Sequence, residues 1–134
     1  MGLEYDPRSH AESLGIAIRS FELPPGWRGA YSHFRRTIYI VEGMSIREER
    51  STLAHEVAHA IAGDEFTDFS FFSDKQEKRA NLFASRALID FEEYRRAEKL
   101  HGPHLPSLAY ELNVTEFVIH FWQKWFANHP SFFS

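Results

Sequence analysis

The 134-residue sequence contains no cysteine, so it has neither a disulfide framework nor a thiolate ligand for a metal ion. Any bound metal must therefore be held by histidine and carboxylate side chains. Basic residues are also in the minority, because 15 Lys and Arg stand against 19 Asp and Glu, for a formal net charge of −4. This balance argues against direct nucleic-acid binding, which usually needs a basic face.

Long apolar runs are missing as well. No stretch approaches the ~20 apolar residues that a membrane-spanning helix needs, and residues 1–6 have neither a basic start nor the apolar run of a signal peptide. We therefore expect a cytoplasmic protein without a membrane partner. The length predicts one domain over residues 1–134, and an aromatic content of 16% predicts a core rich in rings.

The first third of the chain predicts a short helix and three strands. Asp6 can cap the helix, Pro7 suits its first position and Gly15 ends it. Alternation of apolar and polar residues, and runs of β-branched and aromatic residues, are typical of strands. Strands are predicted at 16–22, 28–33 and 36–41, and together they indicate a three-stranded, mainly antiparallel sheet.

The remaining residues predict helices. Ser45 and Glu48 form a capping box that opens a helix ending at Gly63. Further helices are predicted from 73 or 74 to 89, from 90 to 102, from 105 to 112, and from a start framed by Asn113 and Glu116. The predicted fold class is therefore α+β, with a small sheet packed on about five helices.

His55, Glu56 and His59 form the pattern HExxH within the helix that ends at Gly63. Residues four apart lie one turn along a helix and about 40° around its axis, so both imidazoles can reach one ion at about 2.0–2.1 Å. Glu56 projects about 100° from His55, beside the ion, where its carboxylate can take a proton from water. The helix period thus predicts two zinc ligands, His55 and His59, and one catalytic base, Glu56.

A catalytic zinc ion needs a third protein ligand and one open position. The next predicted helix offers Glu77, and alanines on the same face would let the two helices approach closely. Asn81, one turn beyond Glu77, is placed to hold a ligand side chain from behind. His55, His59 and Glu77 form a nitrogen and oxygen donor set that suits zinc, the predicted cofactor.

Three motifs in order resemble those of the ImmA/IrrE family of zinc metallopeptidases. The first is the approach to HExxH and its helix, at residues 49–60. The second, E-x-x-A-N-x-F-A, is at residues 77–84. The third, a leucine–alanine helix followed by a valine–Ser/Thr helix start, is at residues 108–115. The resemblance covers nearly the whole chain, and the order and spacing of three motifs make it specific.

This resemblance implies a compact zincin-like fold, with His55, His59 and Glu77 as zinc ligands and Glu56 as the catalytic base. It also implies a protein substrate, a helix-turn-helix transcriptional repressor of phage, mobile-element or stress genes. At residues 87–90 the chain has Ala-Leu-Ile-Asp, where many family members have Leu-Leu-Met-Pro. No appended DNA-binding or sensor domain is expected.

Other candidate residues concern the substrate. Residues 37–41 could bind a peptide by pairing at a sheet edge. Tyr110, His104 and His120 are candidates to stabilise an oxyanion, although a packing or surface role is favoured for each. Residues 64–72, rich in phenylalanine, could wall a substrate cleft, with core packing as the favoured alternative.

Two other functions stay open at this point. A protein with an intact zinc site could inactivate a repressor or antitoxin by binding it without cleavage. Residues 108–122 also resemble a helix-turn-helix, but the second helix carries an apolar stripe where a DNA-reading helix needs polar groups. Within this stripe, Trp122, Trp125 and Phe126 are expected to lie in the core or, if exposed, to form a partner or dimer surface. The whole apolar stripe comprises Val114, Phe117, Val118, Phe121, Trp122, Trp125 and Phe126.

Overall fold

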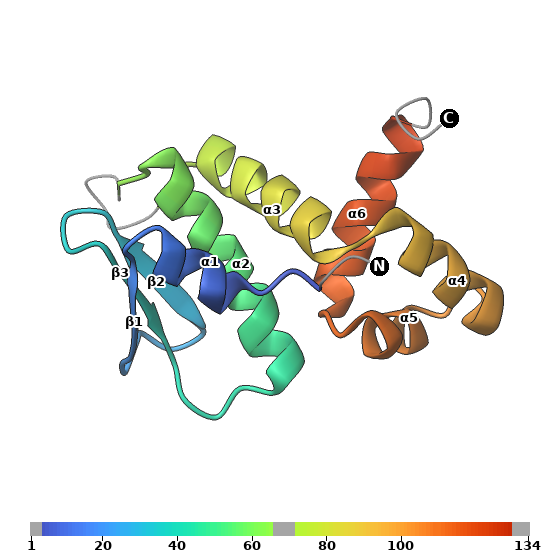
Figure 1. Ribbon diagram of the computed structural model, residues 1–134, viewed down its shortest axis with the longest axis horizontal. Helices are drawn as coiled ribbons and strands as arrows, with labels where there is room; N and C mark the ends of the chain where they lie inside the picture. The colour runs from blue at the N-terminus through green and yellow to red at the C-terminus, as the bar shows by residue number, and fades with distance from the viewer. Residues whose placement is uncertain (1–3, 66–71, 130–134) are drawn as a thin grey trace.

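The computed structural model describes residues 4–65 and 72–129, which form six helices and a three-stranded sheet (Figure 1). The helices are α1 Pro7–Ser13, α2 Ile46–Ala62, α3 Asp74–Leu88, α4 Phe91–His101, α5 Leu105–Leu112 and α6 Glu116–Asn128. The strands are β1 Ala17–Ser20, β2 Gly29–Ser32 and β3 Thr37–Ile40. The predicted α+β fold class is confirmed.

The sheet is mixed, which differs from the mainly antiparallel sheet that was predicted. Its strand order is β1-β3-β2, with β1 parallel and β2 antiparallel to β3. The loop after β1 carries the chain past the position of β3, so β3 returns between the other two strands. Both sides of β3 are therefore paired, and the prediction that residues 37–41 offer an edge to a peptide is wrong.

Local signals account for most helix boundaries. Asp6 caps α1, and the Ser45 capping box opens α2, which ends at Gly63 in the left-handed conformation at φ 70°. One predicted start is wrong: the side chain of Thr115, not that of Asn113, caps α6. Asn113 instead ends α5 in the left-handed conformation, at φ 56°.

Helix α2 lies between the sheet and the other helices and belongs to two hydrophobic clusters (Figure 1). One cluster, around Tyr31 and Val57, joins α2 to α1 and the sheet. The other, around Ala54 and Trp122, joins α2 to the helices α3 to α6. Trp122 is buried, as predicted for the aromatic stripe. Packing from both sides fixes α2, the helix that carries the HExxH pattern.

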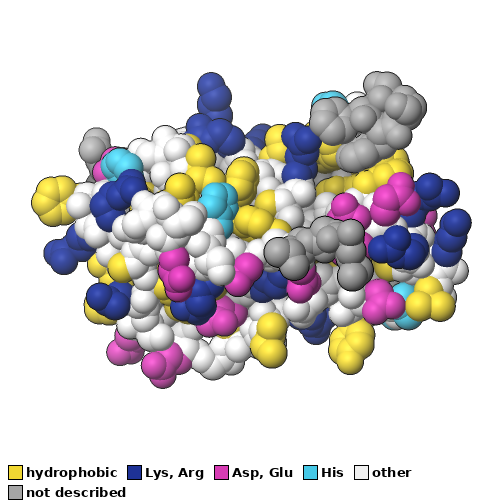
Figure 2. Space-filling model, in the orientation of Figure 1, with side chains coloured by type: hydrophobic (Ala, Val, Ile, Leu, Met, Phe, Trp, Pro, Cys, Tyr) yellow, Lys and Arg dark blue, Asp and Glu magenta, His cyan; other side chains and the backbone are white. Residues whose placement is uncertain are grey.

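Neither a membrane-spanning helix among the described residues nor a field of one charge on the face shown in Figure 2 is found. No helix in residues 4–65 and 72–129 is both long enough and apolar enough to cross a membrane. On the face shown in Figure 2, acidic and basic side chains are interspersed.

Candidate metal centre

Three side chains from two helices converge, namely His55 and His59 of α2 and Glu77 of α3. His59 Nε2 lies 2.7 Å from Glu77 Oε1 and 3.2 Å from His55 Nε2. His55 Nε2 lies 3.3 Å from Glu77 Oε2. The structure thus brings together the three residues that the sequence predicts as metal ligands.

These separations fit a shared metal ion. Two ligand atoms bound at about 2.0–2.1 Å in tetrahedral geometry lie about 3.3 Å apart. The distances of 3.2 and 3.3 Å are close to that value, and the 2.7 Å between His59 Nε2 and Glu77 Oε1 is a hydrogen-bond distance. Two imidazole nitrogens and a carboxylate also form a donor set that binds first-row divalent metals.

Small side chains let α3 approach α2. Ala80 and Ala84 of α3 are 1% and 3% exposed, and Ala84 shares a buried cluster with Ala54 of α2. Because no large side chain separates the helix axes here, the Glu77 carboxylate reaches both imidazoles. The alanine-lined interface predicted from the sequence is present.

His59 is fully buried and is held from behind by Asp64, whose Oδ2 lies 2.8 Å from His59 Nδ1. The left-handed Gly63 turns the chain back at the end of α2, so the Asp64 N–H donates to the His59 carbonyl at 3.0 Å. An Nδ1–H that donates to a carboxylate leaves the Nε2 lone pair facing Glu77 and His55. Phe72 stacks on the same imidazole, with ring centroids 3.8 Å apart.

Asp64 also ties α2 to α3. Its Oδ1 accepts hydrogen bonds from Gln76 Nε2 at 3.2 Å and from the Arg79 guanidinium. Burial raises the pKa of the Asp64 carboxyl, but hydrogen bonds from Arg79 and His59 outweigh burial and lower the pKa below its ordinary value. Sequence reasoning missed Asp64. The available signal was an Asp directly after the glycine that ends the HExxH helix.

The ligand side chains are strongly coupled to one another. Burial lowers the pKa of His55, but its hydrogen bond to Glu77 and the negative charges of Glu56 and Glu77 outweigh burial, and the pKa is raised. A side-chain hydrogen bond with Asn81 also raises the pKa of His55. Hydrogen bonds from His55 and His59 lower the pKa of Glu77 to about 2. Glu77 is therefore an anion at neutral pH.

Glu56 differs from these paired groups. It is 6% exposed, and its Oε1 has no hydrogen-bond partner among the described residues. Burial raises the pKa of Glu56, against the opposing charges of His55 and His59. A buried polar atom without a partner costs about 1–3 kcal/mol, and more when it is charged. Oε1 thus marks a position where a further hydrogen-bonding group would be stabilised.

A groove of about 550 Å³ opens over these residues. Its floor is formed by His55, Glu56, Glu77 and Asn81. On the sheet side lies the strand wall, which we define as Gly26, Arg28 and Gly29. The second wall belongs to α6, and we define this helix wall as Phe117, Val118 and Phe121.

Gly29 lets β2 lie directly against the floor. A Cβ at this position would lie 2.6 Å from Thr52 Cγ2 and 3.2 Å from Glu56 Cγ. The first contact is shorter than side chains tolerate, so a larger residue would force Thr52 or Glu56 to move. The backbone of β2 itself therefore forms this part of the groove.

Alternate residues of β2 direct their backbone N–H and C=O away from β3. In the described part of the chain, β2 pairs with β3 on one side only. The Arg28 carbonyl accepts a hydrogen bond from the Val41 N–H at 3.1 Å, so Arg28 faces β3. Because antiparallel pairing alternates along a strand, the N–H and C=O of Gly29 and Tyr31 point away from β3. Tyr31 is fully buried, whereas Gly29 lines the groove.

The other sequence candidates lie away from the groove or cannot be placed. Tyr110, His104 and His120 are exposed and do not line it. Of the segment 64–72, residues 66–71 lie outside the described part of the chain, while Phe72 packs on His59.

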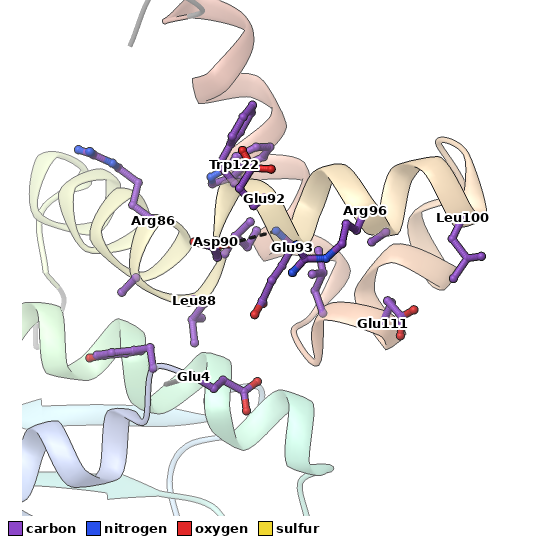
Figure 3. A pocket seen from close by; sticks show the side chains of 16 residues that line it. Glu4, Arg86, Leu88, Asp90, Glu92, Glu93, Arg96, Leu100, Glu111 and Trp122 are labelled. Carbon is purple, nitrogen blue, oxygen red and sulfur yellow. Dashed lines mark hydrogen bonds between the residues drawn. The ribbon is translucent and has the colours of Figure 1, made fainter. Parts of the chain in front are cut away.

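A larger hollow, of about 1210 Å³, lies between the end of α3, helix α4 and helix α5 (Figure 3). Side chains of both charges surround it, among them Arg86, Asp90, Glu93 and Arg96. No residue of the floor or of either wall lines this hollow. The smaller groove is therefore the one that contains groups suited to catalysis.

A compact α+β domain with an HExxH helix, and with a glutamate brought to it from a second helix, defines the metallopeptidase class. The family model described as the IrrE N-terminal-like domain, a peptidase family numbered M78, matches residues 11–121. The chain belongs to this family, which confirms the resemblance to ImmA/IrrE proteins. The matched region contains the floor and both walls. A search of curated proteins found no match to the chain.

Proposed function

We propose that this protein is a zinc-dependent endopeptidase that hydrolyses a peptide bond in a protein substrate. The observation that carries the proposal is the unpartnered Oε1 of buried Glu56, beside the cluster of His55, His59 and Glu77. A structural carboxylate would be paired, as Asp64 is. A general base needs a free oxygen pointed at the position that its substrate occupies.

In this proposal, His55, His59 and Glu77 would hold the zinc ion beside the groove. Bound zinc would supply Lewis acidity at the scissile carbonyl and at the attacking water. Asp64 fixes the ring orientation and the tautomer of His59, and Asn81 contacts His55. Such supporting contacts hold ligand side chains in the geometry that an ion requires.

Glu56 would move the proton. Its Oε1 accepts a proton from the attacking water and returns it to the nitrogen of the departing amine. The raised pKa of this carboxyl favours the step, because a more basic carboxylate is a better proton acceptor.

The strand wall would hold the substrate backbone. An extended peptide could pair with the N–H and C=O of Gly29, which point away from β3 and line the groove. This position lies beside Glu56, because Gly29 packs against that side chain. The sequence prediction placed a bound peptide beside β3, whereas this proposal places it beside β2.

We further propose that the substrate is a helix-turn-helix repressor of phage, mobile-element or stress genes, and that cleavage occurs in the cytoplasm. This follows from the family resemblance. Direct DNA binding by α6 receives no support, because Val118, Ile119 and Trp122 are buried and Phe117 and Phe121 line the groove.

The test is incubation of the zinc-loaded protein with the repressor encoded beside its gene, with Glu56→Gln as the matched variant. We expect wild type to yield two repressor fragments by mass spectrometry. The variant should yield them at least about 100-fold more slowly, because it lacks the general base. Relief of repression by wild type without any cut would instead support binding without cleavage, and the enzyme proposal would be wrong.

A further inference from the structure

Phe117 is a large apolar side chain that stays 59% exposed at the start of α6. Other large hydrophobic side chains are exposed in the described residues, namely Phe21, Phe34, Ile46, Ile61, Leu100 and Tyr110. Among these, Phe117 alone lines the groove that contains His55, Glu56 and Glu77. Its exposure therefore coincides with the candidate active site.

Phe117 belongs to an apolar strip along one side of α6. Phe121 lies one helical turn further on, with its ring centroid 6.3 Å from that of Phe117, and Val118 is buried beside them. These three are the only residues that the helix contributes to the groove. The polar neighbours Glu116 and His120 do not line it. Thr115, which caps α6, also lines the groove, but the side chains that the helix itself presents there are all apolar.

This apolar surface is fixed relative to the floor. Ser51 of α2, one turn before His55, accepts a hydrogen bond from the backbone N–H of Thr115 at 3.2 Å. Ile119 and Trp122, which share a buried cluster with Val118, anchor α6 in the core. A rigid apolar surface beside a catalytic carboxylate is typical of a pocket that selects a side chain.

We propose that Phe117 and Phe121 form a specificity subsite for a large apolar side chain, of the leucine, methionine or phenylalanine type, next to the scissile bond. The inference rests on the proposed peptidase function. A groove of about 550 Å³ holds only a few residues, so the side chains that flank the bond are those that meet the helix wall. A charged side chain would lose water there without gaining a partner from that wall.

The test uses ligand binding, which does not depend on cleavage. The probes are dipeptide hydroxamates that differ in the side chain next to the hydroxamate group, which is that of leucine, phenylalanine, glycine or aspartate. Each probe is titrated into zinc-loaded protein, and its binding is measured by calorimetry. We expect the leucine and phenylalanine probes to bind wild type about 10- to 200-fold more tightly than the glycine probe. The aspartate probe should bind no better than the glycine probe.

Variants assign this preference to the helix wall. Phe117→Ala should reduce the preference for leucine over glycine, and the double variant Phe117→Ala/Phe121→Ala should nearly abolish it. Phe34→Ala is the matched control, because Phe34 is 89% exposed in the turn between β2 and β3 and does not line the groove. It should leave the preference unchanged. Zinc content and circular dichroism verify that each variant is folded and loaded.

Equal affinities for the leucine and glycine probes in wild type would overturn the subsite, as would an absence of binding by every probe. A preference that survives the double variant would also overturn it. A protein that cleaves its repressor but shows no preference contradicts the subsite alone. A protein that shows the preference but cleaves nothing contradicts the peptidase function alone.

Discussion

The two walls of the groove are built from different parts of the chain, and they offer a substrate different chemistry. The strand wall presents the backbone of β2, with a glycine where a side chain would collide with the floor, and its Arg28 is paired with Glu48 at 3.2 Å. The helix wall presents two phenylalanine rings and a valine, without a polar group. One wall is suited to any extended peptide, whereas the other is suited to particular side chains.

This difference separates three tasks within one small domain. Backbone pairing on the strand wall would provide affinity that is independent of sequence. Apolar contact on the helix wall would provide selectivity. The floor would provide the chemistry and is contributed by α2 and α3, which the two hydrophobic clusters hold in place. Changes in one wall should therefore alter one property and leave the others intact.

Among changes to the two walls, the largest effect is expected from Gly29→Ala, which disrupts the strand wall. The new Cβ would lie 2.6 Å from Thr52 Cγ2 and 3.2 Å from Glu56 Cγ, so it would displace the strand or the proposed base. A misplacement of about 1 Å can cost about 100-fold in rate. We expect kcat/KM to fall about 100-fold for every peptide tested, whatever its side chains, while zinc affinity is unchanged.

A second substitution tests the cause of that loss. Thr52→Ser removes the Cγ2 methyl that the new Cβ meets, so Gly29→Ala/Thr52→Ser should recover part of the activity. A loss limited to peptides with large apolar side chains would show instead that Gly29 belongs to the selective surface, and the comparison of the walls would be wrong.

Asp64→Ala should alter the floor and neither wall. It removes the carboxylate that contacts His59 Nδ1 and accepts hydrogen bonds from Gln76 and Arg79. Loss of such a supporting partner typically weakens metal binding by about 10- to 100-fold. Competition with a zinc chelator should show this change, and the order of preference among hydroxamate probes should persist.

Asn81→Ala is expected to weaken zinc binding less than Asp64→Ala does, because it leaves buried His59 in place. An equal or larger effect of Asn81→Ala would contradict this ranking.

The smallest effect concerns the stability of the metal-free protein. The buried carboxylate of Glu56 has an oxygen without a hydrogen-bond partner, and Glu56→Gln replaces this carboxylate by a neutral amide. The substitution should therefore raise the free energy of unfolding by about 1 kcal/mol. Because burial raises the pKa of Glu56 above its ordinary 4.5, the penalty is absent below that pH and grows as the pH rises. The advantage of the variant should therefore be larger at pH 7 than at pH 4.

Glu77 is the matched comparison, because its pKa is lowered whereas that of Glu56 is raised. Its pKa is lowered from 4.5 to about 2, so its stabilising contribution is present above pH 4.5 and is lost as the pH falls toward 2. Glu77→Gln should therefore destabilise the metal-free protein at pH 7. Urea titrations in the presence of a chelator measure both variants. A Glu56→Gln protein that is less stable than wild type at pH 7 would show that the carboxylate is well accommodated.

The sequence predicted the floor of the groove better than its walls. The helix period alone placed His55, Glu56 and His59, and facing alanines predicted the approach of Glu77, because these relations lie within one or two helices. Capping signals likewise placed both ends of α2. Such short-range patterns need no knowledge of the tertiary fold.

Long-range relations were less accessible. The central position of β3 depends on how the loop after β1 crosses the sheet, and the sequence pattern is the same for an edge strand and a central one. Asp64 was missed because its role depends on a turn that brings it back onto His59. The exposed side of Phe117 depends on how α6 packs on α3 and α5, which the periodicity of the stripe alone does not specify.

The measurement that tests the account most directly is the zinc stoichiometry and affinity of wild type against Glu77→Gln, by native mass spectrometry and chelator competition. The account predicts one zinc ion per chain in wild type. It also predicts a loss of more than about 100-fold in affinity in the variant, which exceeds the usual effect of removing a supporting residue. A wild-type protein that takes up no zinc, or a variant that binds zinc as tightly as wild type, would contradict it.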